Sequence, residues 1–185
     1  MMPIGPLMIE HRLIERAIKQ MAVEIDRAKT QGRFDVGFID SWVDFIRTYA
    51  DQAHHGKEEQ ILFHDLADRP LSPALKLMMD GLIEDHVKAR KMVAELVSVR
   101  ERYGKGDAAA FDQMMAIAVG LVDFYPPHIR KEDQEFFIPV MDYFTKEEKD
   151  AMIQRFHEFD ETVIHEHYRS VVERMESRAI GNETI

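Results

Sequence analysis

The sequence contains no cysteine. Disulfides, thiolate zinc sites, iron–sulfur clusters, covalent haem of the CxxCH type and a cysteine nucleophile are therefore all excluded. Because no residue needs an oxidising compartment, we expect the protein to work in the cytoplasm. Any metal that the chain binds must be held by nitrogen and oxygen ligands.

Long apolar runs and basic patches are also missing. The longest apolar run covers residues 114–122, which is far too short to span a bilayer. The first ten residues lack the basic start and long apolar segment of a signal peptide. The net charge of −10 argues against binding to nucleic acid or to anionic membrane surfaces. We therefore expect neither partner, and the sequence leaves the oligomeric state open.

Glycine and proline are few and cluster at boundaries between amphipathic segments. No strand-length alternation recurs, whereas apolar residues repeat at the 3–4 spacing of helices. The pattern predicts an all-α chain. Its five helices cover about 6–30, 35–67, 73–104, 107–138 and 145–178, with a kink or short break at Pro126 and Pro127.

Short connections between long helices favour antiparallel neighbours. We therefore predict an up-down-up-down four-helix bundle over about residues 6–143. The helix at 145–178 must then pack outside or across the bundle. A chain of 185 residues fits a single domain over 1–185.

Nine histidines remain as an unexplained excess. A histidine followed four residues later by glutamate places both groups on one helix face, one turn apart. Chance predicts about one such pair from this composition. The sequence has five: His11/Glu15, His54/Glu58, His55/Glu59, His128/Glu132 and His157/Glu161.

The direction in which each pair faces indicates which pairs could bind a metal inside the bundle. His11 and His86 lie within the apolar stripes of their helices. At 100° per residue, His55 shares a face with buried leucines, so His55/Glu59 is predicted to point inward and the preceding His54/Glu58 pair toward a polar flank.

The fourth helix carries His128 and Glu132 on its apolar side. In an antiparallel bundle all four helices bring their groups to the same half of the molecule, which predicts a metal site with four histidines and two carboxylates. Such mixed ligands suit iron, manganese or zinc. The Glu-x-x-His pattern of ferritin-like di-iron proteins does not occur in the sequence.

Four motifs in this order resemble the hemerythrin-like, or HHE cation-binding, family. They are EH at 10–11, HHGKEEQILF at 54–63, EDHVKAR at 84–90 and PHIRKEDQEFFIP at 127–139. The resemblance implies a four-helix bundle around a non-haem centre of two iron ions. It also implies His11, His55, His86 and His128 as iron ligands, with Glu59 and Glu132 as bridges.

The chain departs from the family pattern at two points. Hemerythrins have a second histidine on the third helix, whose place is vacant here, and His54, His165 and His167 are the candidates to serve that iron. Asp133 competes with Glu132 as the carboxylate after His128, and the one-turn spacing favours Glu132.

Three functions remain open on the sequence alone. The first is a di-iron protein that binds or senses dioxygen or a related small ligand, or handles iron. The second is a di-iron redox enzyme acting on oxygen, peroxide or nitric oxide. The third is a structural bundle, or one that holds zinc or a single metal.

Overall fold

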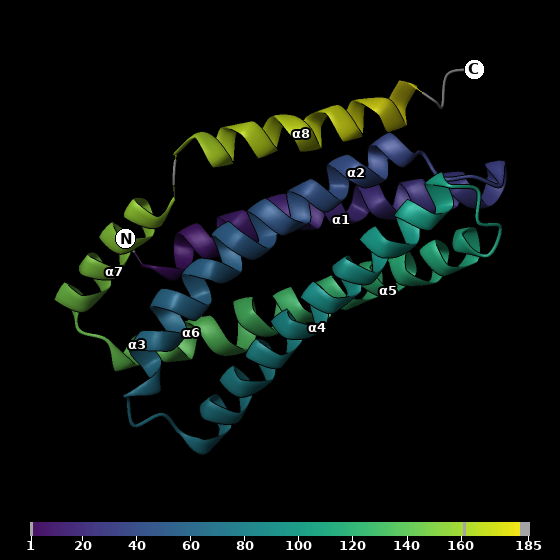
Figure 1. The fold of residues 1–185 in the computed structure, drawn as a ribbon. Helices are drawn as coiled ribbons and strands as arrows, with labels where there is room; N and C mark the ends of the chain where they lie inside the picture. Colours follow the sequence, from purple (N-terminus) through teal and green to yellow (C-terminus); the bar gives the residue numbers. More distant parts are fainter. Residues whose placement is uncertain (1, 161, 182–185) are drawn as a thin grey trace.

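The computed structural model describes residues 2–160 and 162–181, and no strand occurs among them. The all-α prediction is therefore confirmed, and Figure 1 shows long helices packed side by side. The first two long helices are α1 (Ile4–Gln31) and a second that runs through α2 (Val36–Phe45), η1 (Ile46–His55), η2 (Glu58–Phe63) and α3 (His64–Ala67). The third and fourth are α4 (Pro73–Gly104) and α5 (Ala110–Lys131), the latter continued by η3 (Glu132–Phe136), α6 (Phe137–Val140) and η4 (Met141–Tyr143).

Local capping explains where the helices begin. The carboxylate of Asp35 accepts a hydrogen bond from the backbone N–H of Phe38 at 3.0 Å, which starts α2. The hydroxyl of Ser72 accepts from the N–H of Leu75 at 3.3 Å, which starts α4. Each cap satisfies an N–H that has no partner within its helix.

Three segments depart from α-helical geometry. η1, η2 and η3 form π-type turns, in which hydrogen bonds join residues five apart. A wider turn contains more residues, so each residue advances by less than the 100° of an α-helix. All three segments lie in the parts of the second and fourth helices that carry the histidine–glutamate pairs.

Of the kink or short break predicted at Pro126 and Pro127, the break is absent. Both prolines lie inside α5, which continues to Lys131. Tyr125 and Ile129 on either side of them are buried in the core, and their packing holds the helix together across the missing backbone hydrogen bonds.

The hydrophobic core has two parts on either side of a buried polar layer. The larger part surrounds Trp42, whose Nε1 donates a hydrogen bond to the carbonyl oxygen of Ala17 at 2.9 Å. The smaller part includes Phe136, Phe137 and Phe156. The bundle is thus sealed by apolar side chains at both ends of that layer.

The C-terminal segment forms two helices where the sequence pattern predicts one. α7 (Lys146–Phe159) begins at a capping box formed by Thr145 and Glu148 and ends at Asp160, which has an extended backbone conformation. α8 (Thr162–Gly181) then runs back along α1 and α2, outside the bundle (Figure 1). The hydroxyl of Tyr168 donates to Asp44 at 2.9 Å, which fastens α8 to α2.

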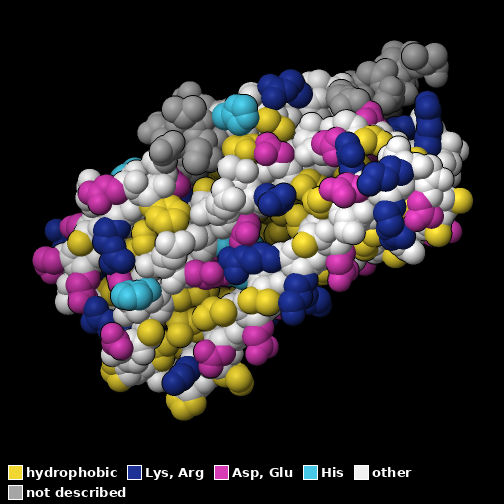
Figure 2. All heavy atoms as spheres, viewed as in Figure 1, with side chains coloured by type: hydrophobic (Ala, Val, Ile, Leu, Met, Phe, Trp, Pro, Cys, Tyr) yellow, Lys and Arg dark blue, Asp and Glu magenta, His cyan; other side chains and the backbone are white. Residues whose placement is uncertain are grey.

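The surface carries charges of both signs. On the face drawn in Figure 2, Lys and Arg side chains alternate with Asp and Glu side chains around hydrophobic patches. Within the described segments, no helix combines the length and apolar character that crossing a bilayer requires.

Candidate metal centre

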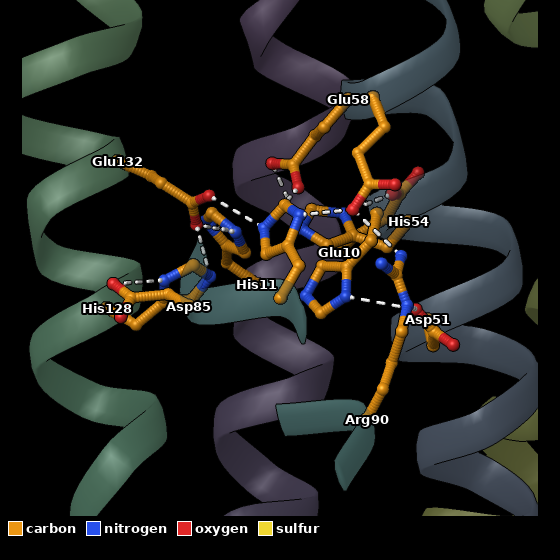
Figure 3. A network of polar contacts seen from close by, with 12 residues as sticks. Glu10, His11, Asp51, His54, Glu58, Asp85, Arg90, His128 and Glu132 are labelled. Carbon is orange, nitrogen blue, oxygen red and sulfur yellow. Dashed lines mark hydrogen bonds and ion pairs between the residues drawn. The ribbon is translucent and has the colours of Figure 1, made fainter. Parts of the chain in front are cut away.

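The polar layer consists of histidines, carboxylates and one lysine that are almost inaccessible to solvent (Figure 3). Its side chains come from all four bundle helices. The buried members are Glu10, His11, His54, His55, Lys57, Glu58, His86, His128, Glu132 and Asp133.

One cluster joins the first, second and fourth helices. His11, His54, Glu58 and Glu132 each offer a ligand atom, and these atoms lie within 4.8 Å of one another. Nε2 of His11 is 3.2 Å from Glu132 Oε2, and Nε2 of His54 is 3.4 Å from Glu58 Oε1. Two imidazoles and two carboxylates around one point could hold a metal ion.

A second cluster consists of His55, His86 and His128, whose ligand atoms also lie within 4.8 Å of one another. The rings of His55 and His86 stack with centroids 3.8 Å apart. Nε2 of His86 is 3.5 Å from an oxygen of Glu58 and 3.5 Å from an oxygen of Glu132. The two glutamates therefore lie between the clusters, where each could contact both metal ions.

The inward-facing atoms of this layer lack hydrogen-bond partners. Among the described residues, this holds for Nε2 of His11, His54, His86 and His128 and for both carboxylate oxygens of Glu58 and Glu132. Buried polar atoms are normally satisfied, since an unpartnered one costs about 1–3 kcal/mol. So many unpartnered nitrogen and oxygen atoms in one place fit a bound cation, which could interact with all of them.

The outward-facing ring nitrogens show the opposite pattern. Each Nδ1 lies beside a carboxylate, which fixes the ring orientation and favours the tautomer whose Nε2 is free to bind a metal. The five pairs are His11–Asp133, His54–Glu10 and His86–Glu59, each at 2.7 Å, and His55–Asp51 and His128–Asp85, each at 3.4 Å.

The ionisation of the layer reflects its burial and its crowding. Burial would lower the pKa of His11, but the facing carboxylates of Asp133 and Glu132 raise it to about 9. Burial, together with the charge of His11, lowers the pKa of His54 to about 4. Burial and the neighbouring Glu132 raise the pKa of Glu58 well above its usual range. The pKa of Glu132 is lowered, because the surrounding histidines outweigh the effect of burial.

Five of the six residues expected from the sequence lie in the two clusters, namely His11, His55, His86, His128 and Glu132. Glu59 does not. It is partly exposed and accepts hydrogen bonds from Nδ1 of His86 at 2.7 Å and from Arg90 at 2.8 Å. Glu58, the residue before it, lies in the first cluster together with His54.

The π-type turns explain this difference. A rotation of 100° per residue holds for an α-helix but overestimates the rotation through the π-type turns of η1 and η2. With wider turns, both His54 and His55 point into the bundle. The one-turn spacing of His54 and Glu58 is the sequence signal for this pair, whereas α-helical geometry places it toward the polar flank.

The remaining alternatives also have definite places. Asp133 contacts Nδ1 of His11 and the guanidinium of Arg12, so Glu132 is the carboxylate that faces the clusters. The side chain of His167 is exposed. The side chain of His165 lies outside the described residues.

A cavity of about 380 Å³ opens beside the second cluster. His55 and Tyr125 form part of its wall, together with aliphatic side chains of η1 and α4. Asp51 and Arg90 also line it, and they are joined by a hydrogen bond of 2.7 Å. A small molecule in this cavity would lie next to His55.

Comparison with known proteins gives one match. A family model described as the hemerythrin HHE cation binding domain matches residues 2–138, which include every residue of both clusters. No curated protein and no solved structure matches the chain. The match covers well over half of the sequence, and the chain belongs to the hemerythrin HHE cation-binding family.

Proposed function

We propose that the chain holds two iron ions, one in each cluster. His11 and His54 would bind the first, His55, His86 and His128 the second, and Glu58 and Glu132 would bridge them. The observation that carries this proposal is the set of buried, unpartnered Nε2 and carboxylate oxygen atoms that face one another. Imidazole and carboxylate are ligands that suit iron, and membership of a cation-binding family agrees with them.

We further propose that this centre binds or senses dioxygen or a related small ligand, in the cytoplasm. A pair of iron ions would supply redox chemistry and coordination positions for such a ligand. The chain contributes burial of the ligand side chains, which limits access of bulk water, and carboxylates that hold the imidazole rings in place. The cavity beside His55 supports access for a small molecule.

Metal analysis combined with optical spectroscopy tests this proposal. We expect close to two iron ions per chain after anaerobic loading with Fe²⁺. We also expect a charge-transfer band when the ferrous protein meets oxygen or the ferric protein meets azide. Less than one metal ion per chain would contradict the di-iron centre, and a loaded protein without either band would contradict the binding of small ligands.

The alternative is a redox enzyme that consumes oxygen, peroxide or nitric oxide. It is favoured by a path for protons through Asp133, whose side chain is 9% exposed and contacts Nδ1 of the buried His11 at 2.7 Å. Such a path can carry protons to or from a buried site. Sustained consumption of one of these substrates by the loaded protein, in the presence of an electron donor, would decide for the enzyme.

A further inference from the structure

A fully buried lysine lies directly behind the first cluster. Lys57 stands in the sequence between the adjacent histidines and Glu58, and its side chain is 0% exposed. Its ammonium group donates hydrogen bonds to Glu10 and to Asp160, the second at 2.5 Å. A buried ammonium group needs such partners. No part of the proposed metal binding accounts for this arrangement.

The contacts of Glu10 connect this lysine to a metal-site histidine. One carboxylate oxygen of Glu10 accepts a hydrogen bond from Nδ1 of His54 at 2.7 Å, and the other accepts from Lys57. Figure 3 shows Glu10 next to His54 at the edge of the cluster. A continuous chain of charge-assisted contacts therefore runs from His54 through Glu10 and Lys57 to Asp160.

The far end of this chain is the corner between α7 and α8. Asp160 is the residue at which α7 ends, with φ −84° and ψ 111°. The preceding Phe159 packs against Gly56, where an added Cβ atom would come within 2.8 Å of the Phe159 ring. Phe159 and Asp160 thus dock on two adjacent residues that lie between the ligand-bearing turns of the second helix.

The corner lies outside the segment that matches the family. That segment ends at residue 138, so the contact of Asp160 with Lys57 belongs to the C-terminal extension of this chain. The same extension carries α8, which packs along α1 and α2. An ion pair therefore connects the metal-site layer to the end of α7, two residues before α8 begins.

We propose that Lys57 and Asp160 are positioning residues that couple the metal site to the C-terminal helices. The proposal rests on the metal centre described above. An imidazole whose Nε2 is bonded to a cation donates a stronger hydrogen bond from Nδ1. This strengthens the contact of His54 with Glu10 and, through Lys57, the contact with Asp160. Coupling between two sites is reciprocal, so metal binding and the docking of α8 stabilise each other.

The test compares two asparagine variants of the full-length chain. Asp160→Asn removes the charge that meets Lys57. Asp65→Asn is the matched control, because Asp65 also accepts a hydrogen bond from α7, from Arg155 at 2.7 Å, but its other contact is with His64 and not with Lys57 or Glu10. Anaerobic Fe²⁺ affinity is measured by competition with a chelator, and hydrogen exchange of the amides of α8 is measured with and without Fe²⁺.

We expect Asp160→Asn to weaken Fe²⁺ binding by about tenfold or more, because loss of the groups that orient a metal-ligating side chain usually has an effect of this size. It should also abolish the protection of α8 amides that Fe²⁺ confers on the unaltered chain. Asp65→Asn should keep both properties. The proposal is overturned if Asp160→Asn binds Fe²⁺ and protects α8 as the unaltered chain does.

A measurement on the metal-free protein separates this proposal from the metal centre itself. The ring ¹⁵N resonances of His54 report its contact with Glu10, and they should shift in Asp160→Asn but not in Asp65→Asn. If the unaltered chain binds no Fe²⁺, the proposed function fails, whereas the positioning role is still decided by these resonances. Unchanged resonances in Asp160→Asn would overturn it.

Discussion

At the scale of single residues, the two nitrogens of each imidazole have different surroundings. Each Nδ1 faces a carboxylate, whereas four of the five Nε2 atoms are buried without a hydrogen-bond partner among the described residues. A histidine that merely filled the core would be satisfied on whichever side its neighbours allowed. The repeated asymmetry indicates rings that are oriented toward a ligand.

The adjacent glutamates Glu58 and Glu59 should respond differently to the same substitution. Glu58→Gln removes a carboxylate that faces both clusters, so we expect it to lose at least one metal ion per chain in metal analysis. Glu59→Gln changes a partner of His86 and Arg90 that lies outside both clusters, and it should keep both metal ions with affinity reduced by about 10–100-fold. Equal metal content in the two variants, or a greater loss in Glu59→Gln, would contradict the proposed ligand set.

Metal binding should release protons at neutral pH. In the metal-free chain the facing carboxylates of Asp133 and Glu132 raise the pKa of His11 to about 9, so His11 carries a proton at pH 7, and burial raises the pKa of Glu58, which favours its protonated form. A metal ion must displace these protons, and its affinity should therefore rise as the pH increases toward 9. Calorimetric titration with Fe²⁺ in buffers of different ionisation enthalpy measures the release. A heat independent of the buffer at pH 7 would refute the expectation.

At the scale of helices, features that depend on the local sequence pattern can be predicted from the sequence. Features that depend on the hydrogen-bond register within a helix cannot. The four bundle helices and the convergence of four histidines follow from the spacing of apolar and polar residues. The choice between Glu58 and Glu59 required the rotation per residue in η1 and η2, which periodicity does not reveal. Partners such as Asp85 come from other helices and depend on tertiary packing.

The corner at Asp160 is another feature that the helical pattern did not reveal. It depends on the close approach of the Phe159 ring to Gly56, which is possible because glycine has no Cβ atom at that position. We expect Gly56→Ala to destabilise the protein by about 1–3 kcal/mol, as overpacking of a buried site usually does.

Gly81→Ala provides the matched control in α4, because nothing lies within 4 Å of the added Cβ atom. There alanine should stabilise the helix by about 0.4–1 kcal/mol. Urea unfolding of the two variants gives both values. A stabilised Gly56→Ala variant would show that Phe159 does not pack as described.

At the scale of the whole molecule, a polar layer separates two hydrophobic cores. The layer sits where a bundle of this length would otherwise bury aliphatic side chains, so the metal-free protein holds charged and unpartnered groups at its centre. Such groups oppose folding unless a ligand satisfies them. The family match ends before α7, and the assignment of all 185 residues to one domain stays a prediction.

Metal binding should therefore raise the stability of the entire chain. A ligand that binds only the folded state adds about 2.7 kcal/mol at a concentration 100 times its dissociation constant. We expect anaerobic Fe²⁺ to raise the midpoint of thermal unfolding and a chelator to reverse the change. His55→Ala and His128→Ala should lose most of this gain. His64→Ala should keep it, because His64 is 74% exposed and lies outside both clusters. If Fe²⁺ stabilises His55→Ala and His128→Ala as much as the unaltered chain, then the metal ion that stabilises the fold is bound elsewhere.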